Sequence, residues 1–153
     1  MIRTWRITKR KHLETAFTGS GARKYGGRWN SPGTAIVYTA ETQSLAALEM
    51  LVHLDNAGLL QGYILVAVDI EESLVEDLDL AQLPNNWRTD PPPPALRKFG
   101  DEWVASAYSV ALRVPSALVP AESNVLLNPA HSDFVKLIVG KPVPFSFDPR
   151  LRK

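Results

Sequence analysis

Hydrophobic and polar positions along the chain predict a mixture of short strands and helices. The clearest strand covers Tyr63–Ile70, where a nearly continuous apolar run is typical of a central, buried strand. Further strands are predicted over Ile2–Ile7, Ala35–Thr39, Val110–Val114 and Val125–Leu127, and near Leu137–Val139. A helical turn is predicted around His12–Phe17, one helix beginning at Thr42 or Ser44 and ending near Asn56, Ala57 and Gly58, and another over Ala95–Ala107.

Two loops separate these elements. The glycine-rich stretch from Thr18 to Gly33 is predicted to be loop throughout. A second loop covers Asn85–Pro94, because its four consecutive prolines forbid both helix and the interior of a sheet. The apolar material on either side of this loop is too short for two cores. The pattern therefore favours an α/β (α+β) fold with mixed or antiparallel sheets, built as one compact domain over residues 1–153.

Composition indicates the class of protein and its expected location. The chain has 153 residues, 45% of them hydrophobic and 22% charged, as expected of a globular protein with a real core. No apolar run approaches a membrane span, the first residues lack the apolar core of a signal peptide, and there is no cysteine. We therefore expect a cytoplasmic protein without membrane association. The net charge of +1 hides a basic segment over residues 1–28 and an acidic one over residues 69–79. The basic segment suggests an anionic ligand, or else a solvated face.

One glutamate is conspicuous on the predicted helix. Over residues 42–54, Glu49 is the only carboxylate, and there is no Lys or Arg. Leu45, Leu48 and Val52 form an apolar stripe at helical spacing, and Glu49 falls on the same stripe. A glutamate is rarely buried unless it is paired. Glu49 is therefore either a catalytic carboxylate or one half of a structural ion pair.

A second candidate is the arginine of Tyr25-Gly26-Gly27-Arg28-Trp29. Two glycines precede Arg28, so no Cβ atom there keeps a ligand away from the backbone. Aromatic residues stand on both sides, and Tyr38 ends the strand that follows. Arginine, aromatic ring and buried carboxylate together suit an anionic, ring-bearing substrate with a cationic centre.

Small polar residues mark a third region. Ser123 and Asn124 lie on a predicted turn between strands, where such side chains commonly bond the backbone. No Gly-x-Ser-x-Gly motif surrounds Ser123, so a serine hydrolase is not supported. Metal binding is also weakly supported. Glu49 and His53 have i, i+4 spacing, but there is no HExxH motif, and we expect no metal site.

Several of these motifs, taken in order, resemble the RES-domain family of bacterial toxins. They are Gly27-Arg28-Trp29-Asn30, Tyr38-Thr39-Ala40, Ser44-Leu45-Ala46-x-Leu48-Glu49, Val114-Pro115-Ser116 and Ser123-Asn124-x-x-x-Asn128-Pro129-x-His131. The resemblance extends over nearly the whole chain. The arginine, glutamate and serine that name the family correspond to Arg28, Glu49 and Ser123, and Tyr38 corresponds to the family's active-site tyrosine.

This resemblance implies an ADP-ribosyltransferase-like fold and a toxin that degrades NAD at the nicotinamide–ribose bond, by phosphorolysis or hydrolysis. NAD is then the substrate, inorganic phosphate a co-substrate in the phosphorolytic case, and no bound cofactor is needed. Arg28 and Glu49 are implied to be catalytic, with Arg28 also gripping the pyrophosphate. Tyr38, Ser123 and Asn124 are implied to bind substrate. The implied partner is a helix-turn-helix (Xre-type) antitoxin. The expected assembly is a homo-oligomer or a toxin–antitoxin complex.

Three other functions remain as alternatives. Some family members are reported to be protein ADP-ribosyltransferases that use NAD. A nucleic-acid-binding module would use the basic segment with Trp5 or Trp29, but the net charge of +1 counts against direct nucleic-acid binding. A non-enzymatic interaction protein would leave the combination of Arg28 and Glu49 unexplained.

Overall fold

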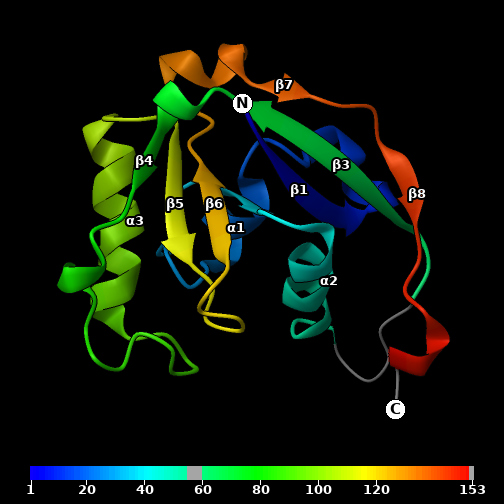
Figure 1. Ribbon diagram of the computed structural model, residues 1–153, viewed down its shortest axis with the longest axis horizontal. Coiled ribbons are helices and arrows are strands. Elements are labelled where there is room, and N and C mark those ends of the chain that lie inside the picture. Colours follow the sequence, from blue (N-terminus) through cyan, green and yellow to red (C-terminus); the bar gives the residue numbers. More distant parts are fainter. Residues whose placement is uncertain (55–59, 152–153) are drawn as a thin grey trace.

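A single mixed sheet organises the protein. The computed structural model describes residues 1–54 and 60–151, and these form eight strands in the order β4-β5-β6-β2-β1-β3-β7, with β8 paired to β3 (Figure 1). The strands are β1 (Ile2–Lys9), β2 (Val37–Ala40), β3 (Tyr63–Ile70), β4 (Val75–Asp77), β5 (Ala111–Pro115), β6 (Ser123–Leu127), β7 (Ile138–Val139) and β8 (Val143–Phe145). The β4–β5 pair is parallel, and the other pairs are antiparallel. The predicted α/β fold with a mixed or antiparallel sheet is confirmed.

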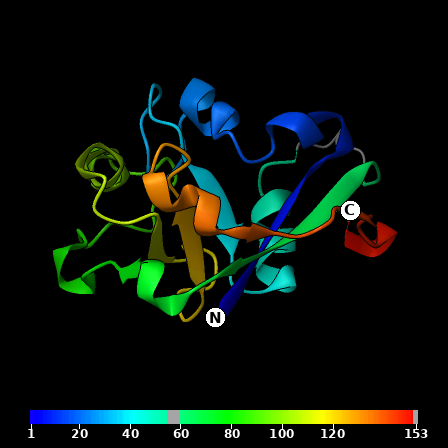
Figure 2. The same cartoon turned by 90° about the horizontal axis from the view of Figure 1, so that it is seen from above.

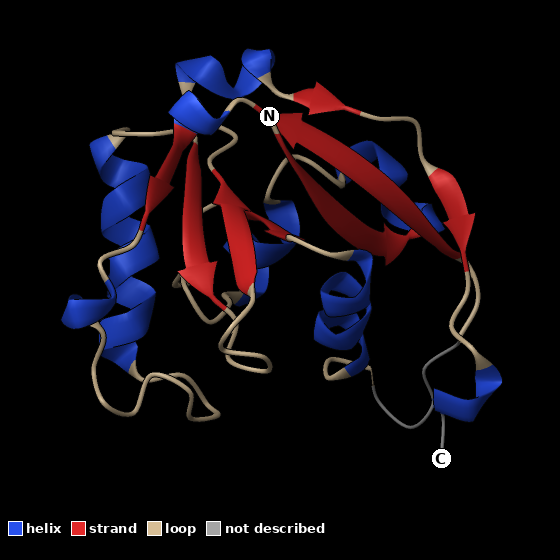
Figure 3. Cartoon of the chain, viewed as in Figure 1, coloured by secondary structure: helices blue, strands red, loops and turns tan. Residues whose placement is uncertain are grey.

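Helices pack around this sheet (Figure 3). The α-helices are α1 (Ser20–Tyr25), α2 (Gln43–Leu51) and α3 (Pro94–Ser106). The 3-10 helices are η1 (Arg10–Thr15), η2 (Glu72–Leu74), η3 (Leu80–Gln82), η4 (Ser132–Lys136) and η5 (Pro149–Leu151). Seen from above, α1 and η1 lie along the same long side of the molecule (Figure 2). Among the described residues, no helix has both the length and the apolar character that crossing a membrane requires.

The structure differs from the predicted elements in three places. The glycine-rich loop contains α1, because Gly19 (φ 72°) and Gly26 (φ 75°) adopt positive φ at its two ends and so act as caps. Helix α2 ends at Leu51, short of the predicted end, which falls in residues 55–59 outside the described part. The short strands β4 and β8 have no counterpart among the predicted strands, and β4 lies in the acidic segment.

The sheet divides into two halves along the junction between β1 and β2. Strand β1 pairs with β3 along its whole length, but its register with β2 is a single pair, Trp5 with Ala40. Figure 1 shows the two groups of strands diverging from this junction. Arg6 of β1 links the two halves across this junction. Its Nη1 donates to the Tyr38 carbonyl of β2 (3.0 Å), and its Nε donates to the Ala16 carbonyl (2.8 Å). Burial lowers the pKa of Arg6 to about 10.

Two separate hydrophobic cores lie on one face of this divided sheet. Ala40 pairs with Asn124, and Asn124 pairs with Val114, so these three side chains share a face. Helix α2 covers one part of that face with a cluster that we call the α2 core: Ile7, Ala40, Leu45, Ala46, Tyr63, Leu65 and Phe147. Helix α3 contributes to a second cluster, the α3 core: Trp29, Ile36, Leu96, Trp103, Leu112, Val114 and Leu126. A third cluster includes residues of the opposite face, among them Val37, Val125 and Leu127.

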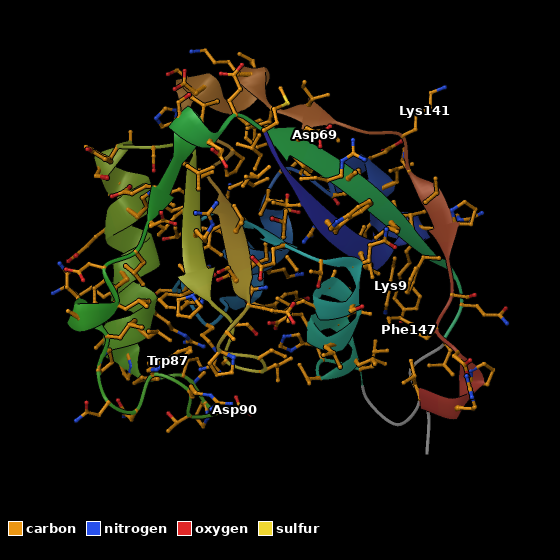
Figure 4. The ribbon with its side chains drawn as sticks, viewed as in Figure 1. Lys9, Asp69, Trp87, Asp90, Lys141 and Phe147 are labelled. Atoms are coloured by element: carbon orange, nitrogen blue, oxygen red, sulfur yellow. The ribbon has the colours of Figure 1, made fainter. Side chains whose placement is uncertain are left out.

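The C-terminal segment completes the α2 core. Phe147 returns to the sheet and packs edge-on against Tyr63, with ring centroids 5.2 Å apart (Figure 4). Because each core is closed by its own helix, the surface between them is the place on this face where polar groups gather.

Candidate active site

The turn that carries Arg28 is tied to Tyr38. The Gly27 amide donates to the Asn30 carbonyl (3.0 Å) and closes the turn. The Tyr38 hydroxyl lies against it, donating to Asn30 Oδ1 (2.5 Å) and accepting from the Trp29 amide (3.2 Å). Burial raises the pKa of Tyr38 above its ordinary value, so the phenol stays neutral. The hydroxyl therefore has protein partners, and the half-buried ring packs against the α3 core.

Gly27 serves a different purpose from the one predicted. A Cβ atom at this position would lie 2.6 Å from the Tyr38 hydroxyl oxygen and 2.9 Å from Asn30 Oδ1. The missing side chain therefore makes room for the tyrosine rather than for a ligand. Trp29 is buried in the α3 core and is not available as a stacking surface.

Arg28 reaches from this turn to the loop before α3. Its Nη1 donates to the carbonyls of Trp87 (3.0 Å) and Thr89 (2.8 Å), and its side chain is half-buried. Figure 4 shows Trp87 and Asp90 on this loop, beneath the ends of β5 and β6. Nε and Nη2 of Arg28 have no hydrogen bond to the part of the chain that the structure describes. These donors remain for an anionic group.

A cavity of about 330 Å³ lies beside the same loop. Its walls come from Leu80, Leu83, Pro84, Asn85, Trp87, Pro115 and Pro120. Two features connect it to the candidate residues. Trp87 supplies the carbonyl that Arg28 binds, and Pro115 directly precedes Ser116.

Helix α3 fixes the position of the Arg28 turn. At Gly100 the helix backbone approaches the Trp29 carbonyl so closely that a Cβ atom would overlap it. Polar residues stand on each side of this contact, Arg97 about one helical turn before Gly100 and Asp101 directly after it. Arg97 Nε donates to the Gly27 carbonyl (3.1 Å), and Asp101 Oδ1 accepts from the Ser31 amide (2.9 Å).

Glu49 is held by a serine 67 positions further along the chain. Ser116 Oγ donates to Glu49 Oε1 at 2.9 Å. The same oxygen accepts from the amides of Leu118 (3.1 Å) and Val119 (3.2 Å). With its acceptor sites occupied by these two donors, the hydroxyl proton is directed at Glu49. One carboxylate oxygen is thereby fixed, and Oε2 forms no hydrogen bond within residues 1–54 and 60–151.

The predicted setting of Glu49 is wrong in one respect. Leu48 is 42% exposed and Val52 is 56% exposed, so the stripe they form with Leu45 does not face the core. The buried side of α2 is instead made by Leu45 and Ala46. Glu49 is half-buried and forms no ion pair with the described residues, so its position at the surface between the two cores suits a ligand-facing carboxylate.

Ser123 and Asn124 begin β6 with side chains on opposite faces. Asn124 shares the face of Tyr38 and donates from Nδ2 to the Thr39 carbonyl (3.3 Å), leaving its amide oxygen for a ligand. Alternation along the strand places Ser123 on the other face, where its carbonyl accepts from the Glu41 amide (3.1 Å). The structure therefore does not bring Ser123 and Asn124 together.

One polar face thus combines residues from four parts of the chain. Tyr38 and Asn124 come from the sheet, Glu49 from α2, and Arg28 from the turn that Tyr38 holds. Sequence reasoning did not assign a role to Ser116, although it lies in one of the matching motifs. The sequence shows only that Ser116 directly follows the end of a predicted strand, at Val114-Pro115. Nothing in the sequence connects Ser116 to Glu49, 67 positions away. His53 is exposed, and residues 1–54 and 60–151 contain no cluster of three potential metal ligands.

Comparison with known proteins identifies the family to which the chain belongs. The family model described as RES domain matches residues 3–148. "Toxin Res" of Yersinia enterocolitica is 44% identical over 97% of this chain and 98% of its own length. "Prs ADP-ribosylating toxin" of a Sphingobium strain is 37% identical over 96% of this chain and 94% of its own length; its name agrees with the expected ADP-ribosyltransferase-like character.

A solved structure shares the fold. The crystal structure of the M. tuberculosis MbcT–MbcA toxin–antitoxin complex contains a chain that superposes with a TM-score of 0.72. The match covers 95% of this chain and 84% of that chain, at 18% sequence identity. The likeness supports the α/β architecture described above. The family match over residues 3–148, together with these relatives, establishes that the chain belongs to the RES domain family.

Proposed function

We propose that this protein is the toxin of a toxin–antitoxin system and that it consumes NAD by breaking the bond between nicotinamide and ribose. The observation that carries the proposal is Glu49, held by Ser116 on the polar face that also bears Tyr38 and Asn124. The names of the relatives, which include Res toxins, support the toxin role.

The chemistry follows from what each group can do. The C1′–N bond breaks, nicotinamide leaves as a neutral base with the bonding electrons, and positive charge develops on the ribose. The free oxygen of Glu49 stabilises that charge or orients the ribose hydroxyls. Arg28 holds the pyrophosphate, the Tyr38 ring packs against the substrate, and Asn124, on the same face as Tyr38, supplies a further hydrogen bond.

The bond to C1′ is completed by a phosphate oxygen or by water. Attack by inorganic phosphate gives ADP-ribose 1″-phosphate, and attack by water gives ADP-ribose after loss of one proton. We favour phosphate slightly. Incubating the purified, antitoxin-free protein with NAD, with and without phosphate, and weighing the products by mass spectrometry tests both. Unchanged NAD after long incubation with folded protein contradicts the proposal, and a phosphate-independent rate with plain ADP-ribose contradicts phosphorolysis.

Transfer to a protein is the second candidate, favoured by the name of the Sphingobium relative, an ADP-ribosylating toxin. In that case a protein side chain replaces phosphate as the nucleophile. Incubation with NAD labelled on the adenine moiety, in the presence of cell extract, separates the two. Label retained on a protein band supports transfer, and label found solely in small molecules supports NAD degradation.

We also propose an antitoxin partner of the helix-turn-helix (Xre) type that blocks this face. The support is the fold shared with a chain from a toxin–antitoxin complex. Co-expression of the toxin with the neighbouring reading frame of its operon, followed by purification of a complex without NAD-cleaving activity, tests the partner.

A further inference from the structure

Two arginines without ion-pair partners among the described residues lie at the turn beside Tyr38. Arg97 donates from Nε to the Gly27 carbonyl, and Arg28 is the next residue of that turn. Neither forms an ion pair within residues 1–54 and 60–151. Arg3, Arg113 and Arg150, by contrast, form ion pairs with aspartates. Arg28 and Arg97 instead bind backbone carbonyls, which leave their positive charges without a carboxylate in contact in the described part of the chain.

The two guanidinium groups act on the same surroundings. Both have an electrostatic influence on the Tyr38 phenol, which places both charges near one ring. The nearby acid is Asp101, one helical turn after Arg97, and its Oδ1 accepts from the Ser31 amide at 2.9 Å. The charge of Arg97 helps to lower the pKa of this carboxyl, but no ion pair joins the two among the described residues. Nη1 and Nη2 of Arg97, like Nε and Nη2 of Arg28, form no hydrogen bonds with described residues.

Neighbouring positive charges repel, and an anion bound between them offsets that repulsion by attracting both. Guanidinium groups bind phosphate through paired N–H donors, and two of them match a ligand with two adjacent phosphates. We propose that Arg97 is a second substrate-binding arginine, and that Arg97 and Arg28 together hold the diphosphate of NAD, one guanidinium on each phosphate. This rests on the proposed function, and it adds a residue to the site.

The anchoring of α3 sets the spacing of the pair. The close approach of Gly100 to Trp29 and the bond between Asp101 and Ser31 fix the helix against the turn. Arg97 therefore approaches the diphosphate from the helix, while Arg28 approaches it from the turn. A diphosphate lies far from the bond that breaks, so Arg97 contributes mainly to binding and appears in KM more than in kcat.

Three variants test the pair. Arg97→Ala removes the guanidinium, and Arg97→Lys keeps a positive charge and a donor for the Gly27 carbonyl. Lys98→Ala is the matched control, because it removes a positive charge from the next residue of α3, whose side chain is 73% exposed. Each is assayed for release of nicotinamide from NAD and from nicotinamide riboside, which has no phosphate. Binding of ADP, which has the diphosphate but no nicotinamide, is measured by calorimetry.

We expect Arg97→Ala to lower kcat/KM for NAD roughly ten- to hundredfold and to weaken ADP binding by a similar factor. Arg97→Lys should lose less, while Lys98→Ala and the cleavage of nicotinamide riboside should be unchanged. Equal losses on both substrates, or ADP binding that is indifferent to Arg97, overturn the proposal. If the wild type binds ADP through Arg97 but leaves NAD intact, the proposed function fails and the arginine pair stands. If NAD is cleaved and Arg97→Ala has a normal KM, the proposed function stands and the arginine pair fails.

Discussion

Ser116 Oγ lies 2.9 Å from Glu49 Oε1, and this bond joins the loop after β5 to the last turns of α2. Two backbone amides occupy the acceptor side of the hydroxyl, so its proton points at the carboxylate. The carboxylate thus has a fixed orientation without a positively charged partner. A carboxylate held in this way can turn its second oxygen toward a developing positive charge.

Glu49→Gln should abolish most activity and leave the fold intact. The glutamine oxygen can still accept from Ser116, but the amide has no charge with which to stabilise the ribose. We expect turnover of NAD to fall roughly hundredfold or more, with a thermal midpoint within a few degrees of the wild type, about the spread of a neutral surface change. Calorimetric melting beside the NAD assay measures both. A strongly destabilised variant with surviving activity would make Glu49 a structural residue.

The two serines should behave differently. Ser116 is fully buried, and Ser116→Ala leaves two amides and Glu49 without its hydroxyl, which should cost about 1–3 kcal/mol in the free energy of unfolding. Ser123→Ala should change both stability and KM for NAD little, because its hydroxyl bonds nothing in the described residues and its side chain lies on the face opposite Tyr38 and Asn124. Denaturant titrations and steady-state kinetics on both variants test this. A raised KM for Ser123→Ala would contradict this placement and assign that serine to the substrate.

Gly27→Ala should damage the site through Tyr38. The added Cβ would stand 2.6 Å from the tyrosine hydroxyl, so the ring or the turn must move. Small displacements of positioned groups are costly, and we expect kcat/KM to fall roughly hundredfold. Gly21→Ala is the matched control, since a Cβ there meets nothing within 4 Å and Gly21 lies within α1. Comparable kinetics for the two variants would show that the contact between Gly27 and Tyr38 is unimportant.

Asp101 should contribute to stability above mildly acidic pH. Burial raises the pKa of Asp101, but hydrogen bonds from Ser31 and Thr34 and the charge of Arg97 outweigh it, and the pKa lies below its ordinary value. A carboxyl whose folded pKa is depressed stabilises the fold above its unfolded pKa of about 3.9, and the gain is lost as pH falls through the folded pKa. Asp101→Asn should therefore be less stable than the wild type at pH 7, with the difference vanishing toward pH 2.

Denaturant titrations at several pH values measure that difference. Asp69 and Asp148 also have lowered pKa values, but both proteins contain them, so their effect cancels. A stability difference that is constant with pH would assign the role of Asp101 to shape rather than charge.

The elements with strong apolar periodicity could be predicted from the sequence, and the weakly patterned ones could not. Tyr63–Ile70 is found as β3, with neighbours on both sides. Helix α1 was missed because its two bounding glycines suggest a loop unless their positive φ values are known. Strands β4 and β8 have three residues each, too few for a periodic signal, and depend on pairing with distant strands.

The candidate site was predictable residue by residue but not as an arrangement. Arg28, Tyr38 and Glu49 were singled out from their neighbours, yet the apolar stripe misjudged which side of α2 is buried, because Leu48 and Val52 are exposed. The contacts of Ser116 and Arg97 depend on tertiary packing across 67 and 70 positions. No local pattern encodes such distances.

The single register pair between β1 and β2 has a consequence for how the chain tolerates change. Residues of the α2 core and of the α3 core belong to separate clusters, so a substitution such as Leu45→Ala and one such as Leu112→Ala should destabilise the protein additively. Each core can therefore vary in sequence on its own. Residues that span the junction, such as Arg6 and the Glu49–Ser116 pair, cannot, because each of them depends on both sides at once.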